Sequence, residues 1–315
     1  MYIGVDIGGS TIVAGLTNGK GQLINRVSRL VNKEWTSEAL CVQTAQLARQ
    51  AAEVGGVAPG NVKAVGIGIP GLANNDTGMV LQTPNLPLNN TPLRELFQKE
   101  WNVPVYLAND ANCAAIGEYL AGAAKGCDPA VVITLGTGLG GGMVVGGKLF
   151  KGFANGGMEV GHICIHPNGA LCGCGNRGCW EQYGSATGLI RITREEMQRN
   201  KKSKLWEYAE DDLHKVSGRT AFQAARQDDE SAHKVLYHYL QGLSLGLTNI
   251  INVLQPEIIC LSGGISGAED DLLLNPLRKL VEQSCFDKAN TPKLVKASLG
   301  NEAGIIGAAM LCNML

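Results

Sequence analysis

The sequence predicts an α/β protein made of two related lobes with a cleft between them. Segments typical of strands and of helices alternate along the chain, which is the pattern of layered α/β folds. An opening motif also occurs twice. Residues 2–18 contain an apolar strand, a Gly-Gly-Ser-Thr turn and a second apolar strand, and residues 130–150 repeat this order. A repeated β-hairpin with a Gly-rich turn indicates that the two halves of the chain begin in the same way.

The composition is that of a compact globular protein. Hydrophobic residues make up 45% of the 315 residues and charged residues 17%, the reverse of the balance in disordered chains. The net charge of −1 provides no field that would hold nucleic acid or an anionic membrane. No stretch is long enough to cross a bilayer, and no basic and apolar leader follows Met1. We therefore expect a cytoplasmic protein that binds neither nucleic acid nor membrane.

Hydrophobic spacing predicts the remaining elements. Apolar residues at helical spacing favour helices over 37–54, after a capping serine, and over 111–124, 232–254 and 303–311. Continuous apolar runs predict buried strands at 62–69, 103–108 and 257–261. Residues 191–219 are the most polar stretch, which we expect to be an exposed helical insertion.

Three glycine-rich loops follow predicted strands, at residues 6–11, 136–142 and 262–266. Glycines let a phosphate approach backbone N–H groups, and the Asp6 carboxylate with the neighbouring hydroxyls can hold phosphate and hydrated Mg²⁺. The alternative for the first loop is a tight hairpin whose glycines only provide a positive φ. The second loop is longer than the roughly two residues that a hairpin turn needs. Three such loops together indicate a nucleotide.

A carboxylate stands where a predicted strand meets a predicted helix, in Asn109-Asp110-Ala111-Asn112. One interpretation is that Asp110 is the N-cap of the helix, the usual role of an isolated Asp at such a place. The other is a general base for a substrate hydroxyl, fixed by its position on a rigid element. These four residues alone leave both interpretations open.

A short Gly-rich stretch has the ligand spacing of a zinc site. One imidazole and three thiolates would fill all four positions of a tetrahedral zinc ion, which makes such a site structural. The alternative is a set of incidental reduced thiols. The four candidate ligands are His162, Cys172, Cys174 and Cys179.

The other cysteines have simpler interpretations. Cys164 and His166 lie in the same stretch and are interpreted as bystanders, while the six remaining cysteines are scattered singly and indicate buried reduced thiols. A zinc ion would hold the neighbouring Glu159 and Glu181 rigidly. Together with Asn85 and Asn109, they make a set of donors and acceptors suited to the hydroxyls of a sugar.

These segments together resemble the ROK family of repressors, open reading frames and kinases. The resemblance covers nearly the whole chain, and its cysteine motif is highly specific. The segments that carry it are residues 6–11, 84–86, 109–112, 136–142, 159–162 and 172–181, with 300–309 at the end. The resemblance implies an actin-like ATPase fold with two ribonuclease-H-like lobes and ATP in the interlobe cleft. The small lobe would comprise residues 1–110 plus 300–315, and the large lobe residues 111–299.

The resemblance also implies roles for individual residues, with Asp110 as the catalytic base. The first two glycine loops would hold phosphates, Asp6 would lie near Mg²⁺, and the third loop would border the adenosine. Residues implied in sugar binding are Asn85, Asn109, Asp110, Glu159, His162 and Glu181. Residues implied in nucleotide binding are Asp6, Gly8, Gly9, Ser10, Thr11, Gly136, Thr137, Gly138, Gly263 and Gly264. The implied ligands of a structural Zn²⁺ are His162, Cys172, Cys174 and Cys179.

The implied activity is transfer of the γ-phosphoryl group of ATP to a hexose hydroxyl, O6 of glucose being expected. N-acetylmannosamine, N-acetylglucosamine, fructose and allose are alternative substrates, and a homodimer is typical of the family. The rival function is that of a sugar-responsive repressor. Such members carry a helix-turn-helix domain before the first glycine loop, for which the position of Asp6 leaves no room. A sugar sensor without catalysis would not need Asp110 and a complete set of phosphate loops.

Overall fold

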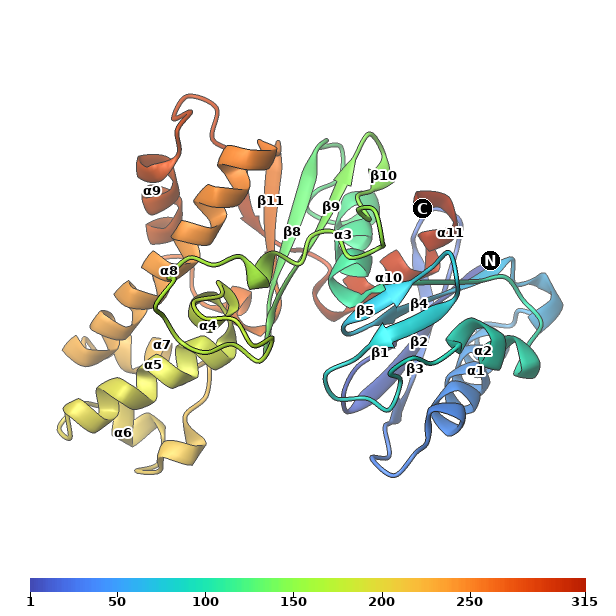
Figure 1. Cartoon of the computed structure of the whole chain (residues 1–315), viewed down its shortest axis with the longest axis horizontal. Coiled ribbons are helices and arrows are strands. Elements are labelled where there is room, and N and C mark those ends of the chain that lie inside the picture. The colour runs from blue at the N-terminus through green and yellow to red at the C-terminus, as the bar shows by residue number, and fades with distance from the viewer. The chain divides into compact units, whose positions relative to one another are not determined.

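The computed structural model describes residues 1–315 and divides into two compact units. The first comprises Met1–Val132, Gly142–Met158 and Ala297–Leu315, and the second comprises Ile133–Gly141 and Glu159–Lys296. Each unit contains β-strands with helices packed on them (Figure 1). The division between the units passes through two strands, β8 (Ala130–Leu135) and β9 (Leu139–Val145).

The sheet of the first unit has five strands in the order β3-β2-β1-β4-β7. Strand β1 pairs antiparallel with β2, and β2 with β3, while β1 pairs parallel with β4, and β4 with β7. A separate hairpin is formed by β5 (Leu72–Asn74) and β6 (Met79–Gln82). The bounds of the sheet strands are β1 Tyr2–Ile7, β2 Thr11–Thr17, β3 Leu23–Leu30, β4 Ala64–Ile69 and β7 Val105–Asn109.

Helices cover both faces of this sheet. On one face α1 (Ser37–Val54) and α2 (Leu93–Glu100) pack on the apolar side chains of β1, β2 and β4, and form the larger core of the unit. On the other face lie α3 (Asp110–Ala121), α10 (Ala303–Ala309) and α11 (Leu311–Met314), with a smaller core between them. Short 3₁₀ turns at Pro59–Asn61 and Gly300–Glu302 complete the unit.

Three glycines form a row across the sheet under α10. Gly4 of β1 is the register partner of Gly15 in β2 and of Gly66 in β4. A Cβ atom on Gly4 would lie 1.8 Å from the carbonyl oxygen of Ile305, and one on Gly66 would lie 1.7 Å from that of Ala308. Because a side chain on Gly4 or Gly66 would collide with helix backbone, these glycines allow α10 to lie directly on the strands, while a Cβ atom on Gly15 would meet the side chains of Ile305 and Leu23.

The second sheet repeats the strand order of the first. Its order is β10-β9-β8-β11-β12. In chain order, the first strand of each sheet (β1 or β8) is central, with the second strand (β2 or β9) on one side and the fourth (β4 or β11) on the other. The long helix α8 (Glu230–Leu254) is the centre of the helical part and contacts α4, α5, α7 and α9. The remaining bounds are β10 Lys148–Leu149, β11 Ile258–Ser262, β12 Lys293–Lys296, α4 Glu181–Gly184, α5 Ala186–Arg199, α6 Leu205–Tyr208, α7 Thr220–Ala225 and α9 Leu274–Ser284. Short 3₁₀ turns lie at Val160–His162, Leu213–Lys215 and Gly264–Gly267.

The repeated hairpin and the predicted helices are present, but several boundaries differ from the prediction. Helix α1 is capped by Thr36, whose hydroxyl accepts the N–H of Ala39, and not by Ser37. Strand β9 begins at Leu139, so only residues 136–138 of the predicted loop 136–142 lie outside the strands. Gly142, at the end of that run, is there for packing, since a Cβ atom on it would lie 2.7 Å from the Cβ of Ala115.

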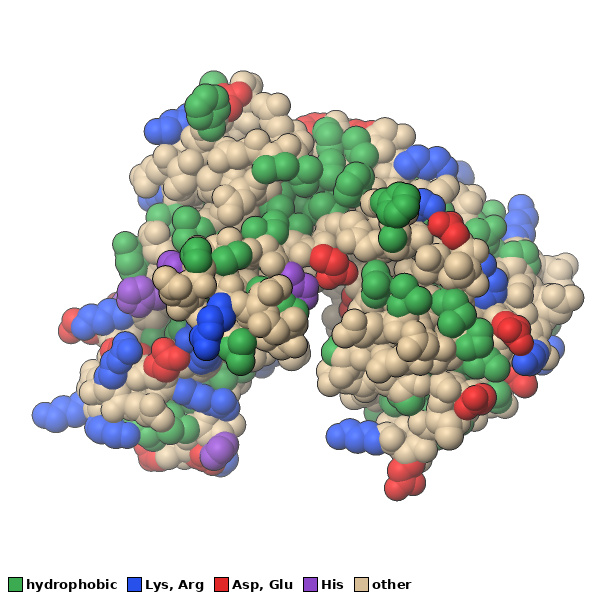
Figure 2. Space-filling model, viewed as in Figure 1, with side chains coloured by type: hydrophobic (Ala, Val, Ile, Leu, Met, Phe, Trp, Pro, Cys, Tyr) green, Lys and Arg blue, Asp and Glu red, His purple; other side chains and the backbone are tan.

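The contact-based units assign α3 to the first unit, where it packs along α10. The sequence-based domains instead place residues 111–299 together, and those boundaries stay a prediction. Acidic and basic side chains are interspersed on the molecular face in Figure 2, as the net charge of −1 leads one to expect. None of the helices combines the length and the apolar character needed to span a membrane.

Candidate functional site

The first unit brings two carboxylates together. Asp6 is the penultimate residue of strand β1, and Asp110 is the first residue of α3. Burial and the charge of Asp110 raise the pKa of Asp6 from its ordinary value of 3.8 to about 6. Loss of hydration also raises the pKa of Asp110, although its side chain still reaches solvent. The pair is therefore poised for a group that neutralises negative charge or takes up a proton.

Asn109, and not Asp110, is the N-cap of α3. Its Oδ1 accepts the N–H groups of Ala111 at 2.8 Å and of Asn112 at 3.4 Å, and its Nδ2 donates to the carbonyl of Gly71 at 3.0 Å. The N-cap interpretation of Asp110 is thus wrong, because the preceding amide already fills that role. Asp110 Oδ1 accepts the N–H of Ala111 at 2.9 Å.

The first glycine loop is a hairpin turn that does not need glycine for its backbone angles. The N–H of Gly8 donates to the carbonyl of Thr11 at 2.9 Å, and neither Gly8 nor Gly9 has a positive φ. The alternative interpretation, in which the glycines of this hairpin only provide a positive φ, is therefore wrong. A Cβ atom on Gly9 would meet only Asn85, at 3.8 Å. The loop thus leaves its backbone open on the side of a predicted sugar-binding residue.

In the second unit the four predicted zinc ligands come together. One ligand atom from each of His162, Cys172, Cys174 and Cys179 lies within 4.8 Å of all the others. The Sγ atoms of Cys174 and Cys179 are 3.6 Å apart, and Cys172 Sγ is 3.7 Å from His162 Nδ1. Two thiolates bound at about 2.3 Å to one tetrahedral zinc lie roughly 3.8 Å apart. The donor set and its spacing therefore fit a zinc ion.

Local backbone geometry closes this cluster. Cys172 and Asn176 form a tight turn, in which the N–H of Cys172 donates to the carbonyl of Asn176 at 2.8 Å and the N–H of Gly175 donates to the carbonyl of Cys172 at 3.0 Å. Gly175 and Gly178 have φ values of 93° and 73°, which glycine adopts readily. The N–H of Asn176 is the main reason that the pKa of the exposed Cys174 thiol is lowered to about 7, a shift that favours the thiolate form that binds metal.

The remaining cysteines and His166 lie outside the cluster. Cys164 is exposed and its Sγ donates to the carbonyl of Arg177 at 3.5 Å, while the His166 ring packs against Tyr183. Neither belongs to the metal-binding group. The six scattered cysteines form no disulfides, and five of them are buried while Cys312 is partly buried.

Glu181 links the cysteine cluster to the second glycine loop. Its Oε2 accepts the N–H of Leu139 at 3.0 Å, and its Oε1 accepts a weak hydrogen bond from Cys172 Sγ at 3.8 Å. A Cβ atom on Gly138 would lie 2.5 Å from the same carboxylate, so glycine is needed at this position for packing. Gly161 packs its backbone against the carbonyl of Leu139 and so holds the segment with the exposed Glu159 and His162 beside the loop.

The third glycine loop touches the end of β8, the strand that leads into the second loop. Gly263 has a φ of 89°, and a Cβ atom there would lie 2.6 Å from the carbonyl oxygen of Leu135, the last residue of β8. Gly264 has no neighbour within 4 Å of an added Cβ. The two loops of the second unit that were predicted to hold phosphates and adenosine are thus adjacent, with open backbone at Gly264.

One contributor to the second loop was missed by the sequence analysis. Thr187, at the start of α5, donates from Oγ1 to the carbonyl of Thr137 at 2.7 Å, and the N–H of Ala186 donates to the carbonyl of Gly136 at 2.9 Å. Ser185 caps this helix by accepting the N–H of Gly188. The signal was present, since a capping serine precedes an amphipathic stretch, but only the fold shows that this helix begins at the loop.

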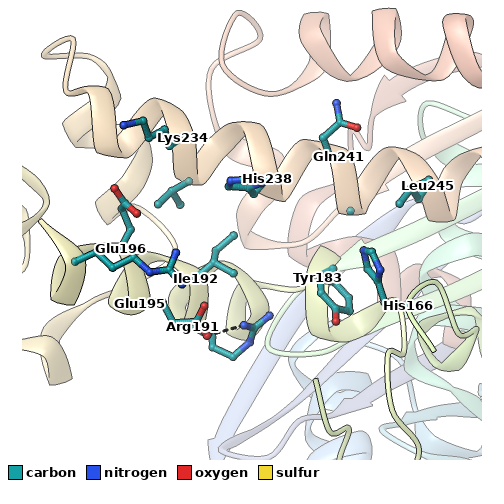
Figure 3. Close-up of a pocket in the computed structure, with 13 residues that line it drawn as sticks. His166, Tyr183, Arg191, Ile192, Glu195, Glu196, Lys234, His238, Gln241 and Leu245 are labelled. Carbon is teal, nitrogen blue, oxygen red and sulfur yellow. Dashed lines mark hydrogen bonds and ion pairs between the residues drawn. The ribbon is translucent and has the colours of Figure 1, made fainter. Parts of the chain in front are cut away.

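A cavity of about 320 Å³ lies elsewhere in the second unit, between α5 and α8 (Figure 3). None of the predicted site residues lines it. Its charged side chains are largely paired, Arg191 with Glu195 at 2.7 Å and Lys234 with Glu230 at 2.7 Å. The cavity therefore has no marked excess of one charge that would indicate a particular ligand.

Comparison with known proteins places the chain in a family. A model of the ROK family matches residues 2–314. A glucokinase of Thermotoga maritima is 36% identical over 311 residues, which cover 98% of this chain and 96% of the relative. A xylose repressor of Caldicellulosiruptor bescii is 28% identical over 318 residues, covering 99% of this chain and 78% of the repressor.

A solved structure agrees with these relatives. The crystal structure of a ROK family glucokinase from Streptomyces griseus, in complex with glucose and AMPPNP, superposes with a TM-score of 0.84 at 34% identity and covers 98% of both chains. This likeness confirms the predicted actin-like ATPase fold. By its family match and by its identity to relatives along nearly its full length, the chain belongs to the ROK family.

Proposed function

We propose that this protein is an ATP-dependent hexose kinase that transfers the γ-phosphoryl group to glucose, with Asp110 as the general base. The observation that carries the proposal is the position of Asp110, open to solvent on the first turn of a capped helix and beside Asp6. The similarity to a glucokinase solved with glucose and an ATP analogue supports the choice of substrates. ATP is abundant in the cytoplasm, where we expect the protein to act.

The residues proposed to bind the sugar are Asn85, Asn109, Asp110, Glu159, His162 and Glu181. Amide and carboxylate groups of this kind provide both donors and acceptors for several hydroxyls. N-acetylmannosamine, N-acetylglucosamine, fructose and allose remain the alternative acceptors.

The nucleotide would be bound by the three glycine loops. Backbone N–H groups of residues 8–11 and 136–138 would hold phosphate oxygens, and Gly263 and Gly264 would border the adenosine. Asp6 would hold Mg²⁺, because a carboxylate whose ionised form is disfavoured by burial and by a like charge gains most from a bound cation. When bound, Mg²⁺ neutralises charge on the phosphate oxygens.

The chemical step would follow from the position of Asp110. Its carboxylate accepts the proton of the sugar hydroxyl as the hydroxyl oxygen forms a bond to the γ-phosphorus, and the bond from that phosphorus to the β,γ-bridging oxygen breaks. Asn109 keeps the base in place by capping α3. The loop N–H groups stabilise the charge that spreads over the phosphoryl oxygens.

Transcriptional repression is the second candidate, because a xylose repressor is among the relatives. Turnover separates the two functions. A repressor needs to bind a sugar but has no need of a general base, whereas a kinase must release ADP in proportion to the sugar consumed.

Replacing Asp110 by Asn should nearly abolish phosphorylation. In a coupled assay across a hexose panel, the wild type should release ADP from MgATP when glucose is present. This release should stop when Mg²⁺ is chelated. Asp110→Asn should lower kcat by about 10²-fold or more, since general base catalysis contributes factors of that size, while calorimetry still detects glucose binding. The exposed Asp271 provides the same chemical change as a control, Asp271→Asn. Wild-type kcat in Asp110→Asn would disprove the assignment, and an inactive wild type would disprove the kinase function.

Replacing Asp6 by Asn should stabilise the free protein at neutral pH. Because the folded pKa of Asp6 is about 6 and its ordinary value is 3.8, the folded state holds a proton between these values that the unfolded state has lost. The contribution of Asp6 to the free energy of unfolding therefore falls as the pH rises through that window. Above pH 6 the full cost of ionising the buried carboxyl is present. Without nucleotide or Mg²⁺, Asp6→Asn should be more stable than the wild type at pH 8 by about 1–3 kcal/mol.

The pH dependence provides the check on this prediction. Near pH 3.5 the wild-type side chain is protonated, so the difference in the free energy of unfolding between the two proteins should vanish. Urea unfolding at several pH values measures it. An Asp6→Asn variant that is less stable than the wild type at pH 8 would contradict the raised pKa.

We further propose that the cysteine cluster binds one structural Zn²⁺ per chain. The wild type should contain zinc by mass spectrometry, and chelation should lower its Tm, since binding energy of the ion is folding energy. Cys179→Ser should lose the zinc, because the buried Cys179 is one of the four ligands. Cys164→Ser, a change in the same stretch outside the cluster, should keep it. A wild type that neither contains nor takes up zinc would contradict the proposal.

The homodimer implied by the family is a further proposal. Sedimentation velocity should give twice the chain mass of 33.2 kDa, and a monomer at micromolar concentration would speak against it.

A further inference from the structure

A carboxylate deep in the first unit has a role that the proposed mechanism does not use. Glu118, in the third turn of α3, is fully buried and is the only Asp, Glu, Lys or Arg side chain in the buried class. Its Oε2 accepts the N–H of Ala123 at 2.8 Å, and the N–H and hydroxyl of Ser298 at 3.1 and 3.3 Å. Its Oε1 accepts the N–H of Leu299 at 2.8 Å.

The surroundings of Glu118 are shaped to hold the carboxylate. A Cβ atom on Gly122 would lie 2.0 Å from Glu118 Oε2, so only glycine leaves room for the oxygen at this position. No ion pair with a Lys or Arg compensates the charge. Four neutral donors do so instead, three of them backbone N–H groups. A buried carboxylate is costly unless its oxygens are satisfied in this way.

The segment that Glu118 binds leads directly to Asp6. The chain enters the first unit at Ala297 and passes through Ser298 and Leu299 before α10 begins at Ala303. Helices α3 and α10 lie side by side (Figure 1). A Cβ atom on Gly304, in the first turn of α10, would lie 3.4 Å from the carboxylate oxygen Oδ2 of Asp6. The position of this turn thus decides how much room and hydration Asp6 has.

The same helix α3 carries both Asp110 and Glu118. Two turns separate them. Gly117 brings the backbone of α3 against α10 at the start of the latter, since a Cβ atom there would lie 2.2 Å from the carbonyl oxygen of Ala303. The Glu118 carboxylate therefore fixes α3, which carries the proposed general base Asp110. It also fixes the segment 298–299, which precedes α10 beside Asp6.

We propose that Glu118 is a positioning residue for phosphoryl transfer, which keeps Asp110 and Asp6 in register by tying residues 298–299 to α3. This inference rests on the proposed kinase function. It goes beyond that function in assigning a part of the catalytic geometry to a residue that touches neither sugar nor nucleotide. A displacement of the order of 1 Å at reacting groups is enough to cost about a hundredfold in rate.

Two variants test the proposal in different ways. Glu118→Gln keeps the shape but replaces one acceptor oxygen by a donor that faces N–H groups. Gly122→Ala keeps the carboxylate but displaces it, at a φ of −112° that alanine also adopts. Two controls match them. Glu95→Gln makes the same chemical change at an exposed ion pair, and Phe97→Leu weakens the core on the other face of the sheet.

The readout is steady-state kinetics well below the Tm of every variant. Glu118→Gln and Gly122→Ala should lower kcat by about ten- to a hundredfold, with the KM for glucose within about twofold of the wild type. Glu95→Gln should match the wild type, and Phe97→Leu should lower the Tm but keep kcat. Amide hydrogen exchange over residues 298–304 should be faster in the two test variants alone.

The outcomes separate this inference from the function on which it rests. If the wild type phosphorylates glucose but both test variants keep kcat, or if Phe97→Leu loses kcat to the same extent, Glu118 is only structural and the inference falls while the kinase function stands. If Glu118→Gln does not fold, Gly122→Ala decides by the same criteria. If no hexose supports ADP release by the wild type, the function fails and the inference with it.

Discussion

The close contact between α10 and the row of glycines in the first sheet is the constraint on which the catalytic geometry depends. Gly4, Gly15 and Gly66 stand side by side across three strands, and the backbone of α10 lies directly on Gly4 and Gly66. Contact of backbone with backbone leaves no side chain to adjust, so the helix can shift only if the sheet does. Asp6 lies two residues beyond Gly4 on the same strand, and its surroundings are set by where α10 begins.

The second unit fixes its loops by other means. Glu181 joins the cysteine cluster to the N–H of Leu139, and Thr187 joins the start of α5 to the carbonyl of Thr137. These are hydrogen bonds from side chains to the backbone of a loop, which by itself has few contacts. A metal ion in the cluster would restrict the motion of Glu181, and through it the loop beside Gly138. Glu181, one of the proposed sugar ligands, and the proposed phosphate loop would thus share one rigid support.

Much of this arrangement could be predicted from the sequence, and the failures have a common cause. The repeated hairpin and the cysteine cluster depend on local spacing, which a sequence displays. The hydrogen bond from the Asn109 amide to Gly71 and the packing of Gly142 against Ala115 join residues that are distant in the chain. A run of glycines looks the same whether it admits a ligand or a neighbouring helix. Only the fold shows that Gly142 lies against α3 whereas Gly9 and Gly264 keep open space.

The three carboxylates of the first unit show how one fold can hold negative charge for different purposes. Glu118 is satisfied by four donors and is fully buried, so its charge is accommodated within the folded protein. Asp6 and Asp110 are less well satisfied, and burial raises the pKa of both. Their ionised forms are therefore costly in the free protein, and a cation or a proton from a substrate relieves that cost. In the proposed mechanism the protein gives up stability at the pair that would do the chemistry, and a satisfied carboxylate would keep that pair in place.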